Sequence, residues 1–509
     1  MARFGRLGVL AAVIWVVAAA CGSDEGDAVS TTTVATTIVS ETTTTAGPTT
    51  TALVTTSTVA PGGKQYGGEV VIADDQEPPT LNPFIPGGDN FIVSIVGQAH
   101  MAGAYDVAAP SLELVPELVV EIPSAANGGV TVNDDGSMSV RYRIRDDAAW
   151  SDGMPVTGDD FALTLALEQG LCMQVFDTAV EFEVEEVGPK TVVVRADTPT
   201  LHYETLFTWV APAHALAGTD PCGDWIDVTW PAAGPFVVDE VVRGDRITLV
   251  RNENYWKTDL ETGQQLPYLD SVEFRFIPEV ESIVSAFRSR DVDVIQPPPF
   301  YETVEKLEGL GPEGAVVEVV AGPVWEHFNF QFGPGNRNES SLNQYRPYRQ
   351  ALAYAIDRDA MLEAIEVVPS TQAADSFISF SVGAGTGSWA QYEPNPVRAR
   401  QLVAEACEQA GRDCAAEPPT VVFSTTSNGD VRIRIAEALE SQLEAAGIQV
   451  DLELEDSQLF FGETLESGTW DMGLWAWVAS TGAAGTAATF GLFDPDSPPP
   501  DGDNYYRWG

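Results

Sequence analysis

Basic side chains are scarce in this chain of 509 residues, where 26 lysines and arginines stand against 75 aspartates and glutamates. The formal net charge of −49 repels phosphate backbones and anionic lipid surfaces, so we do not expect nucleic acid as a partner. Acidity of this kind is more typical of a solubility adaptation than of a ligand selected by charge.

Histidine is scarcer still, and the usual signatures of catalysis are missing. None of the four histidines belongs to an HExxH motif or to a spaced metal pair. The sequence also lacks a GxSxG nucleophile elbow, a P-loop and a GxGxxG motif that opens a helix after a strand. We therefore expect no catalytic residues, no metal and no cofactor. Paired carboxylates of a glycoside hydrolase remain an alternative, because 75 acidic residues always supply candidate pairs.

Long apolar runs are missing except at the N-terminus, where a basic start precedes an apolar stretch from Leu7 to Ala20. This order is typical of a secretory signal, so we expect residues 1–20 to be a signal peptide. The stretch is about 14 residues long, shorter than the roughly 20 that a spanning helix needs. An uncleaved membrane helix is therefore the weaker interpretation.

The residues AAAC at 18–21 resemble the lipobox of bacterial lipoproteins, in which the cysteine thiol receives a diacylglyceryl group. The resemblance implies that Cys21 is the lipidated start of the mature chain, held at the outer face of the cytoplasmic membrane. Residues 21–66 are rich in Thr and Ser and poor in large apolar side chains, which predicts a disordered tether. A coil of this length reaches on the order of 35 Å. Its composition also permits O-glycosylation.

Beyond Cys21, only four cysteines remain: Cys172, Cys222, Cys407 and Cys414. No CxxC pair is present, so a zinc ribbon or a thioredoxin-like redox site has no support. An even count in an exported chain predicts disulfides. Bonds from Cys172 to Cys222 and from Cys407 to Cys414 are the most economical of three pairings, because each then stays within one expected lobe. Four unpaired buried thiols are the alternative.

Helical and strand patterns alternate in the C-terminal half, which favours an α/β architecture. The pattern predicts a strand over 419–424, a helix that Asp430 caps and Gly447 ends, and a strand over 448–454. A right-handed crossover would make the two strands parallel neighbours. Asn395 followed by proline predicts the start of another helix.

The N-terminal half is richer in strands. Residues 130–145 predict a hairpin that turns at Asn133–Gly136. The same turn is a fragment of a calcium loop, but the ligand at the twelfth position and the flanking helices are missing, so the turn is favoured. Residues 243–245 read Arg-Gly-Asp, an adhesion tripeptide, and are better explained as the turn between two strands.

Four blocks are distinctive when taken together: GGEVVIADDQEPPTLNPF (67–84), VRYRIRDDAAWSDGMPVTGDDF (140–161), AAGPFVVDEVVRGDRITLVRNENYW (232–256) and YRPYRQALAYAIDRDAML (345–362). In this order they resemble the solute-binding lipoproteins of ABC importers, in the group that includes oligopeptide-, dipeptide- and nickel-binding proteins. The resemblance covers about residues 67–509. It implies a bilobed periplasmic-binding-protein-like fold of two α/β lobes joined by hinge crossovers, the N-terminal lobe enlarged with extra strands. Ligand is then enclosed as the lobes close.

The family's layout implies a first lobe over 67–322, a second over 323–478, and a return toward the first lobe over 479–509. Two departures stand out. Peptide binders of the family often carry an aspartate after the strand matching 470–477, where it receives the peptide's amino terminus, but here no acid follows until Asp494. Family members also continue well past the residues matching the end of this sequence, so we expect a truncated chain.

Trp475 and Trp477 lie two residues apart on a presumed strand, so both should point to one face. That face either lines the ligand cleft or forms the core of the second lobe, and the sequence does not favour one over the other. Trp325, beside His327, is either part of a cleft cluster or a packed strand residue. We also take Asn329, Asn90 and Tyr105 as candidate ligand-binding residues.

The sequence therefore predicts a lipid-anchored, monomeric solute-binding receptor that is not an enzyme. We expect it to deliver a peptide or peptide-like solute to the transmembrane subunits of an ABC permease. The alternatives are a secreted hydrolase of wall polysaccharide and a bilobed cell-surface sensor.

Overall fold

The computed structural model describes residues 64–507 with gaps, and all of them from Tyr66 onward belong to one compact unit. The stretches left out within that range are 86–87, 89, 109–112, 173–179, 227–229, 299, 320–323, 333–341, 367–388, 428, 457–458, 479–492, 494 and 496–503. The side chains of Val324, Trp325, Glu466 and Val478 are left out as well. The predictions for the signal peptide, for Cys21 and for almost all of the tether lie outside the described residues.

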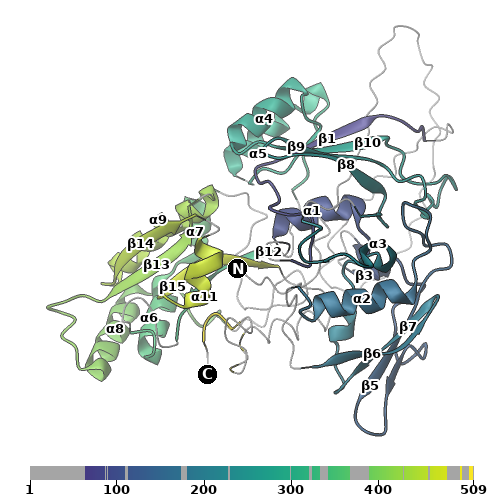
Figure 1. Cartoon of the computed structure of the whole chain (residues 1–509). Helices are drawn as coiled ribbons and strands as arrows, with labels where there is room; N and C mark the ends of the chain where they lie inside the picture. The colour runs from purple at the N-terminus through teal and green to yellow at the C-terminus, as the bar shows by residue number, and fades with distance from the viewer. Residues whose placement is uncertain are drawn as a thin grey trace, which may run out of the picture. The chain divides into compact units, whose positions relative to one another are not determined.

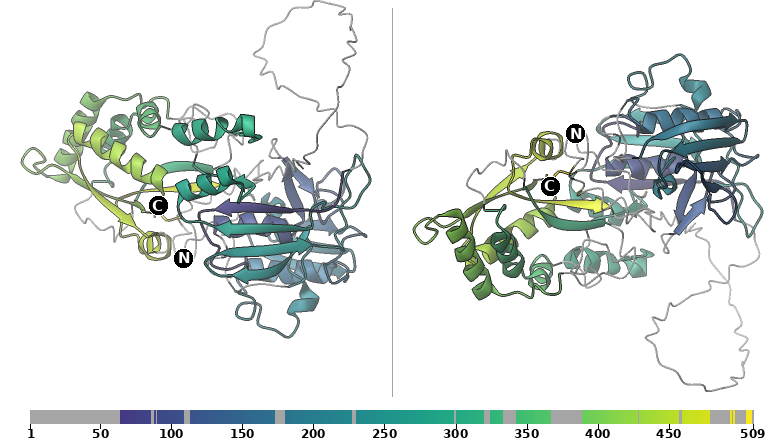
Figure 2. Two further views of the ribbon diagram at one scale, coloured as in Figure 1. Left: turned by 90° about the horizontal axis from the view of Figure 1, so that it is seen from above. Right: turned by 90° about the horizontal axis from the view of Figure 1, so that it is seen from below.

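The first lobe is built on a mixed five-stranded sheet with the strand order β11-β1-β10-β9-β8 (Figure 1). Its strands are β1 (Glu69–Asp74), β8 (Phe236–Val242), β9 (Arg246–Arg251), β10 (Ser271–Phe276) and β11 (Val294–Ile295). β1 runs parallel to both β10 and β11, and Figure 2 shows this purple strand beside the teal strands of the same sheet. Ile283 of α4 (Val280–Ser289) packs against Ala73 of β1, so α4 covers this part of the sheet.

A second, fully antiparallel sheet enlarges the first lobe with the order β4-β5-β7-β6. Its strands are β4 (Val130–Val132), β5 (Met138–Arg143), β6 (Phe182–Gly188) and β7 (Thr191–Ala196). β4 and β5 pair as the predicted hairpin, and the side chains of Met138, Val140, Tyr142 and Ile144 are buried on one side of it. The remaining elements of this lobe are α1 (Phe91–His100), β2 (Tyr105–Ala108), β3 (Glu113–Pro116), α2 (Gly158–Glu168), η1 (His202–Glu204) and α3 (Ala213–Leu216).

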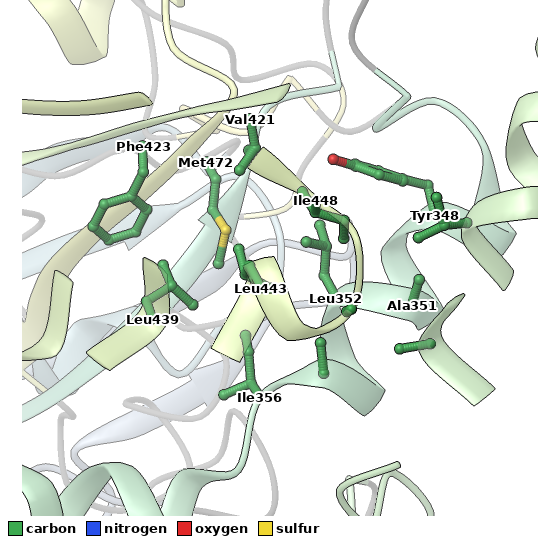
Figure 3. Close-up of a cluster of buried hydrophobic side chains, with 14 of the residues drawn as sticks. Tyr348, Ala351, Leu352, Ile356, Val421, Phe423, Leu439, Leu443, Ile448 and Met472 are labelled. Atoms are coloured by element: carbon green, nitrogen blue, oxygen red, sulfur yellow. The ribbon is translucent and has the colours of Figure 1, made fainter. Parts of the chain in front are cut away.

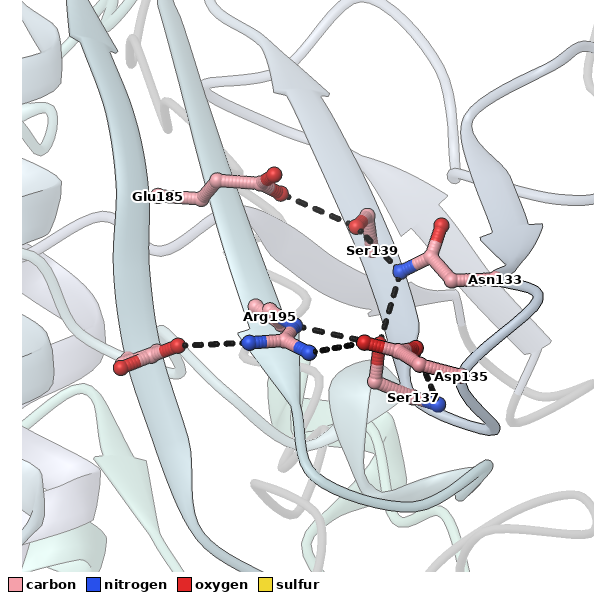
Figure 4. Close-up of polar contacts among 7 residues, drawn as sticks. Asn133, Asp135, Ser137, Ser139, Glu185 and Arg195 are labelled. Carbon is pink, nitrogen blue, oxygen red and sulfur yellow. Dashed lines mark hydrogen bonds and ion pairs between the residues drawn. The ribbon is translucent and has the colours of Figure 1, made fainter.

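The turn of that hairpin is held by polar contacts on the solvent side of the sheet (Figure 4). Gly136 has φ +89°, a conformation that favours glycine, and its N–H donates to the carbonyl of Asn133. Arg195 donates to Asp135 at 2.6 Å and to Glu183 at 3.2 Å. The carboxylate of Asp135 thus has a side-chain partner and a turn-stabilising role. The turn interpretation is confirmed by the β4–β5 pairing.

The Arg243–Asp245 segment is likewise the turn between β8 and β9, as predicted, because the N–H of Asp245 donates to the carbonyl of Val242. Arg243 donates to the carbonyl of Pro78 at 2.6 Å and to Glu77 at 3.3 Å. The tripeptide therefore fastens the loop after β1, which leaves the adhesion interpretation without structural support.

The second lobe is built on a four-stranded sheet with the order β12-β15-β13-β14. The strands are β12 (Val324–Phe330), β13 (Thr420–Thr426), β14 (Gln449–Glu455) and β15 (Met472–Val478). The helices of this lobe are α6 (Arg346–Ala355), α7 (Arg358–Ala364), α8 (Pro396–Ala410) and α9 (Asp430–Ala445), with η3 (Phe460–Thr464) and α11 (Leu465–Ser467) before β15. β13 and β14 are parallel neighbours joined by α9, so the predicted strand, helix and strand are confirmed.

Helices α6, α8 and α9 form an apolar core on one face of this sheet (Figure 3). Leu352 of α6 and Leu443 of α9 meet Phe423 and Met472 of the sheet, and all four are almost fully buried. The apolar side chains recur at helical spacing on α9 and at strand spacing on β13, which is why one face of each element enters this core.

The predicted start of α8 is confirmed, since the side chain of Asn395 accepts a hydrogen bond from the N–H of Arg398. The prediction that Asp430 caps α9 is wrong by one residue. Gly429 is the cap, with extended backbone, and Asp430 is the first helical residue. A carboxylate in the first turn still interacts favourably with the helix dipole, which accounts for the acidic residue there.

Two disulfides join Cys172 to Cys222 and Cys407 to Cys414, the pairing that the sequence favoured. Within the described residues, none of the helices combines the length and the apolar character that crossing a bilayer requires. The lobe boundaries at 322 and 478 stay predictions.

Candidate functional site

The antiparallel pairing of β12 with β15 decides which side chains share a face of the second-lobe sheet. His327 lies opposite Trp475, and Asn329 lies opposite Gly473. Because neighbours along a strand alternate, Phe328 and Leu474 point to the other face, into the core under the helices. The two faces of the sheet therefore differ, one being aliphatic and covered by helices, the other aromatic and polar.

The second face carries an aromatic cluster that the sequence predicted only in part. Its buried members are Phe460, Leu465, Trp470, Trp475, Trp477, Tyr505 and Tyr506. Trp475 is 1% exposed, stacks on Tyr506 with ring centroids 6.0 Å apart, and meets Trp470 edge-on at 5.3 Å. Edge-on and offset aromatic pairs of this kind add to the stabilisation that burial gives. Trp475 and Trp477 do share one face, and residues of the chain itself cover them.

The backbone of residues 504–507 is bonded to this side of the sheet. The N–H of Phe332 donates to the carbonyl of Tyr506 at 2.9 Å, and the side-chain amide of Gln331 donates to the carbonyl of Tyr505 at 2.9 Å. Arg507 donates to the carbonyl of Ser467, at the end of α11, at 3.0 Å. This short segment therefore closes over the aromatic cluster.

Tyr506 gathers the polar groups of the cluster around its hydroxyl. The indole N–H of Trp477 donates to that hydroxyl at 3.0 Å, and Nε2 of His327 lies 3.3 Å from it. The His327 ring also lies close to both indoles, with centroids 5.8 Å from Trp475 and 6.5 Å from Trp477. The hydroxyl of Tyr506 therefore joins Trp477 of β15 to His327 of β12.

Two residues near the start of β15 shape this side of the sheet: Gly473 makes room for the Trp475 ring, and Asp471 links neighbouring parts of the chain. A Cβ atom at Gly473 would lie 2.8 Å from Cζ3 of Trp475, so only glycine lets that ring lie across the backbone. The fully buried carboxylate of Asp471 accepts from the N–H of Val422 at 3.1 Å, and its backbone carbonyl accepts from Asn343 at 2.6 Å. Asp471 thereby ties β13 and β15 together beneath the cluster.

The buried polar atoms at this site that have no hydrogen-bond partner among the described residues include Nε1 of Trp470, Nε1 of Trp475 and Oγ of Ser424. Buried donors in native proteins are normally satisfied by protein, by water or by a ligand. In chemical terms the cluster is a packed aromatic core that holds buried indole and hydroxyl groups. Among the described residues, no group of three or more His, Cys, Asp or Glu side chains is placed to hold a metal ion.

Comparison with known proteins identifies the architecture. The family model of the bacterial extracellular solute-binding proteins, family 5 (middle region), matches residues 113–495. The chain belongs to this family of solute-binding proteins. Its bilobed α/β fold is the one that the sequence predicted.

Known relatives of this solute-binding family agree with the match. The oligopeptide-binding protein OppA of Bacillus subtilis is 23% identical over 382 residues, which are 69% of this chain and 66% of that protein. The solved structure of the periplasmic EDTA-binding protein EppA gives a TM-score of 0.68 at 22% identity, with 87% of this chain and 83% of the other covered. The oligopeptide-binding protein of Thermus thermophilus, solved with a pentapeptide, gives 0.64 at 20% identity, with 86% and 83% covered.

The remaining predicted site residues of this solute-binding protein are spread over both lobes. Tyr105, in β2, lies beside Tyr142 with ring centroids 6.5 Å apart, and burial raises the pKa of its phenol well above the usual range. Asn90 precedes α1, and its side chain makes no capping bond there. Asn329 is buried and donates to the carbonyl of His327 at 3.1 Å. Trp325 pairs with Trp477 through the backbone of β12. Ligand contact by any of them stays a prediction.

Sequence reasoning missed Tyr506, Gly473 and Asp471. The signal for Tyr506 was present as two adjacent tyrosines near the end of the sequence, but nothing in the local pattern predicts that they reach β12. Gly473 and Asp471 flank Met472 in the strand already singled out for its tryptophans. Their roles depend on the register between strands, which a single sequence does not reveal.

Proposed function

We propose that this protein is the substrate-binding component of an ABC transporter, which captures a peptide or peptide-like solute between its two lobes and delivers it to the permease. The observation that carries the proposal is the family match over 113–495, on a structure whose fold agrees with solute-binding proteins over most of its length. The secreted hydrolase and the sensor receive no support from the relatives reported above.

The proposed ligand class rests on the comparisons with known proteins. The relatives reported above include proteins named for binding oligopeptides, and one solved neighbour was crystallised with a pentapeptide. The buried carboxylate of Asp471 already accepts a backbone N–H within the second lobe. We therefore do not assign Asp471 to a salt bridge with a ligand amine.

The finer points of location belong to the same proposal. A signal peptide over 1–20 and acylation of Cys21 would hold a monomeric receptor at the outer face of the cytoplasmic membrane, close to its permease. The sequence pattern AAAC followed by a Thr-rich stretch supports this arrangement.

A binding assay without turnover tests the function. Random peptide pools of fixed length, from dipeptides to nonapeptides, are added to the purified protein, and the melting temperature is followed with free amino acids as the matched control. We expect at least one peptide pool to raise the melting temperature, because a ligand that binds only the folded state stabilises it. Mass spectrometry should recover the peptides uncut. Cleaved peptides, or equal shifts with free amino acids, would contradict the proposal.

A further inference from the structure

Helix α5 (Tyr301–Glu308) and the short helix η2 (Gly311–Glu313) lie on the connection between the last strand of the first-lobe sheet and β12, the next strand in the chain, which belongs to the second-lobe sheet. A connection of this kind has to adjust when two lobes move relative to each other. The contacts that α5 and η2 make with α4 of the first lobe and with α7 and α9 of the second lobe therefore affect how freely the lobes move.

The N-terminus of α5 is held by the second lobe. The first N–H groups of a helix have no partner inside the helix, and the cap residue Phe300 provides no side-chain acceptor. Instead, the N–H of Tyr301 donates to the carbonyl of Glu366, just after α7, at 2.8 Å. Glu366 has φ +59°, a left-handed conformation that is uncommon for residues other than glycine.

A single side chain of α9 reinforces this contact. The guanidinium of Arg434 lies 4.2 Å from the centroid of the Phe300 ring, within the range of a cation–π interaction. The same guanidinium lies 3.3 Å from the carboxylate of Glu366 and 3.4 Å from the carbonyl of Ile365. Arg434 therefore joins three parts of the chain: α9, the end of α7 and the start of α5.

The other end of the connection is held by the first lobe. Arg290, which ends α4, donates to the carbonyl of Glu313 in η2 at 2.9 Å. Arg290 is a second left-handed residue that is not glycine, with φ +63°. Lys306 of α5 also lies 3.2 Å from Glu281 of α4. Two of the four left-handed residues other than glycine in the described chain thus hold opposite ends of this connection.

We propose that α5 and η2 form a latch between the lobes, with Arg434 as the positioning residue that sets how firmly α5 is held by α7 and α9. Capture of a solute by closing lobes, which is the proposed function, then proceeds from a connection that is already ordered. Loosening the latch increases the conformational entropy that capture must remove, and affinity falls without any change in ligand contacts.

Hydrogen exchange of the ligand-free full chain tests the latch directly. In Arg434→Met the flexible apolar stem remains, while the cation over Phe300 and the bond to Glu366 are lost. We expect amides of 300–308 to exchange faster by about fivefold or more, with α4 and the middle of α9 unchanged. The variant Phe300→Leu removes the same cation–π contact from the other side and should reproduce the effect.

Arg432→Met is the matched control, because Arg432 lies on the same helix, α9, and pairs with Glu326 of β12 at 2.9 Å rather than with α5. It should leave the exchange of 300–308 unchanged. Faster exchange confined to α9, or equal effects of the two arginine variants on α5, would overturn the latch.

The coupling to capture has a separate readout. Affinity for a pentapeptide pool should fall about fivefold in Arg434→Met and stay within about twofold in Arg432→Met. Faster exchange of α5 with unchanged affinity would overturn the coupling. Absence of pentapeptide binding by the unaltered protein would count against the proposed ligand class and would leave the exchange result to judge the latch alone.

Discussion

Among single residues, Trp475 is the clearest case in which packing decides the effect of a substitution. Its indole is 1% exposed and is surrounded by rings of the same chain. Trp475→Ala should lower the free energy of unfolding by about 3 to 5 kcal/mol, measured by urea denaturation. Leu260→Ala is the control, because Leu260 is fully exposed and its loss should change stability by less than about 0.5 kcal/mol.

The sequence left open whether Trp475 and Trp477 serve the core or the cleft, and stability alone does not exclude ligand contact. Trp477→Ala is therefore measured for both melting and peptide affinity. We expect a clear loss of stability, because Trp477 is buried and donates to Tyr506. Affinity per folded molecule that falls by about tenfold or more would show that this indole also reaches the ligand.

Gly473→Ala tests the close approach of Trp475 to the strand. The added methyl group would lie 2.8 Å from the indole, so the ring has to move and stability should fall by about 1 to 3 kcal/mol. In Trp475→Phe the ring is smaller, and Gly473→Ala should then be tolerated better. Equal losses in both backgrounds, measured as a double-mutant cycle, would show that the two residues do not interact.

His100 makes the stability of the folded chain depend on pH. Burial lowers the pKa of His100 to about 4 from 6.5, although Nδ1 lies 3.2 Å from the carbonyl of Val96, which opposes the shift. The unfolded chain therefore binds a proton at a higher pH than the folded one. The neutral imidazole contributes full stability above pH 6.5, and that contribution is lost progressively as the pH falls from about 6.5 to about 4.

Lowering the pKa of His100 from 6.5 to about 4 corresponds to about 3 kcal/mol in the free energy of unfolding. Asp74 acts in the opposite direction, since burial raises its pKa from 3.8 to about 6 and favours the folded state at low pH. His100→Asn keeps a donor near Val96 but does not titrate. Its stability should fall less steeply than that of the unaltered chain between pH 6.5 and about 4. Parallel profiles would show that His100 is not the responsible group.

Among the elements, the two disulfides should differ in their contributions. Cys172 and Cys222 close a loop with a sequence separation of 50, whereas Cys407 and Cys414 are separated by 7. In the chain-entropy model the long loop contributes about 4 kcal/mol and the short one about 2 kcal/mol. Replacing each pair by serine and comparing urea midpoints tests the order. A larger loss for the short loop would contradict it.

The elements also show what a single sequence can predict. The strand, helix and strand of β13, α9 and β14 followed from hydrophobic period together with helix-start and helix-stop signals, and the β4–β5 hairpin followed from period two and its turn residues. The cap of α9 was displaced by one residue, because an aspartate suits both the cap and the first turn. The aromatic cluster was predicted only as two tryptophans on one face, since contacts such as Tyr506 with Trp477 join residues that are 29 apart in sequence and depend on where residues 504–507 lie against the sheet.

For the molecule as a whole, family membership and the bilobed α/β fold are established, while the solute, the anchor and the permease are proposals. The net charge of −49 repels phosphate backbones, so nucleic acid is not an expected partner of such a receptor. The latch through α5 adds a mechanical element to this picture that the ligand contacts alone would not supply.

Mass spectrometry of the protein purified from its own organism tests the central proposal most directly. The folded protein is first weighed in its native state, and the bound molecule is then released by denaturation and fragmented. We predict that one intact peptide or peptide-like molecule is released per chain, with no cleavage products. A preparation that carries only wall oligosaccharide fragments, or that shortens added peptides with time, would contradict the account.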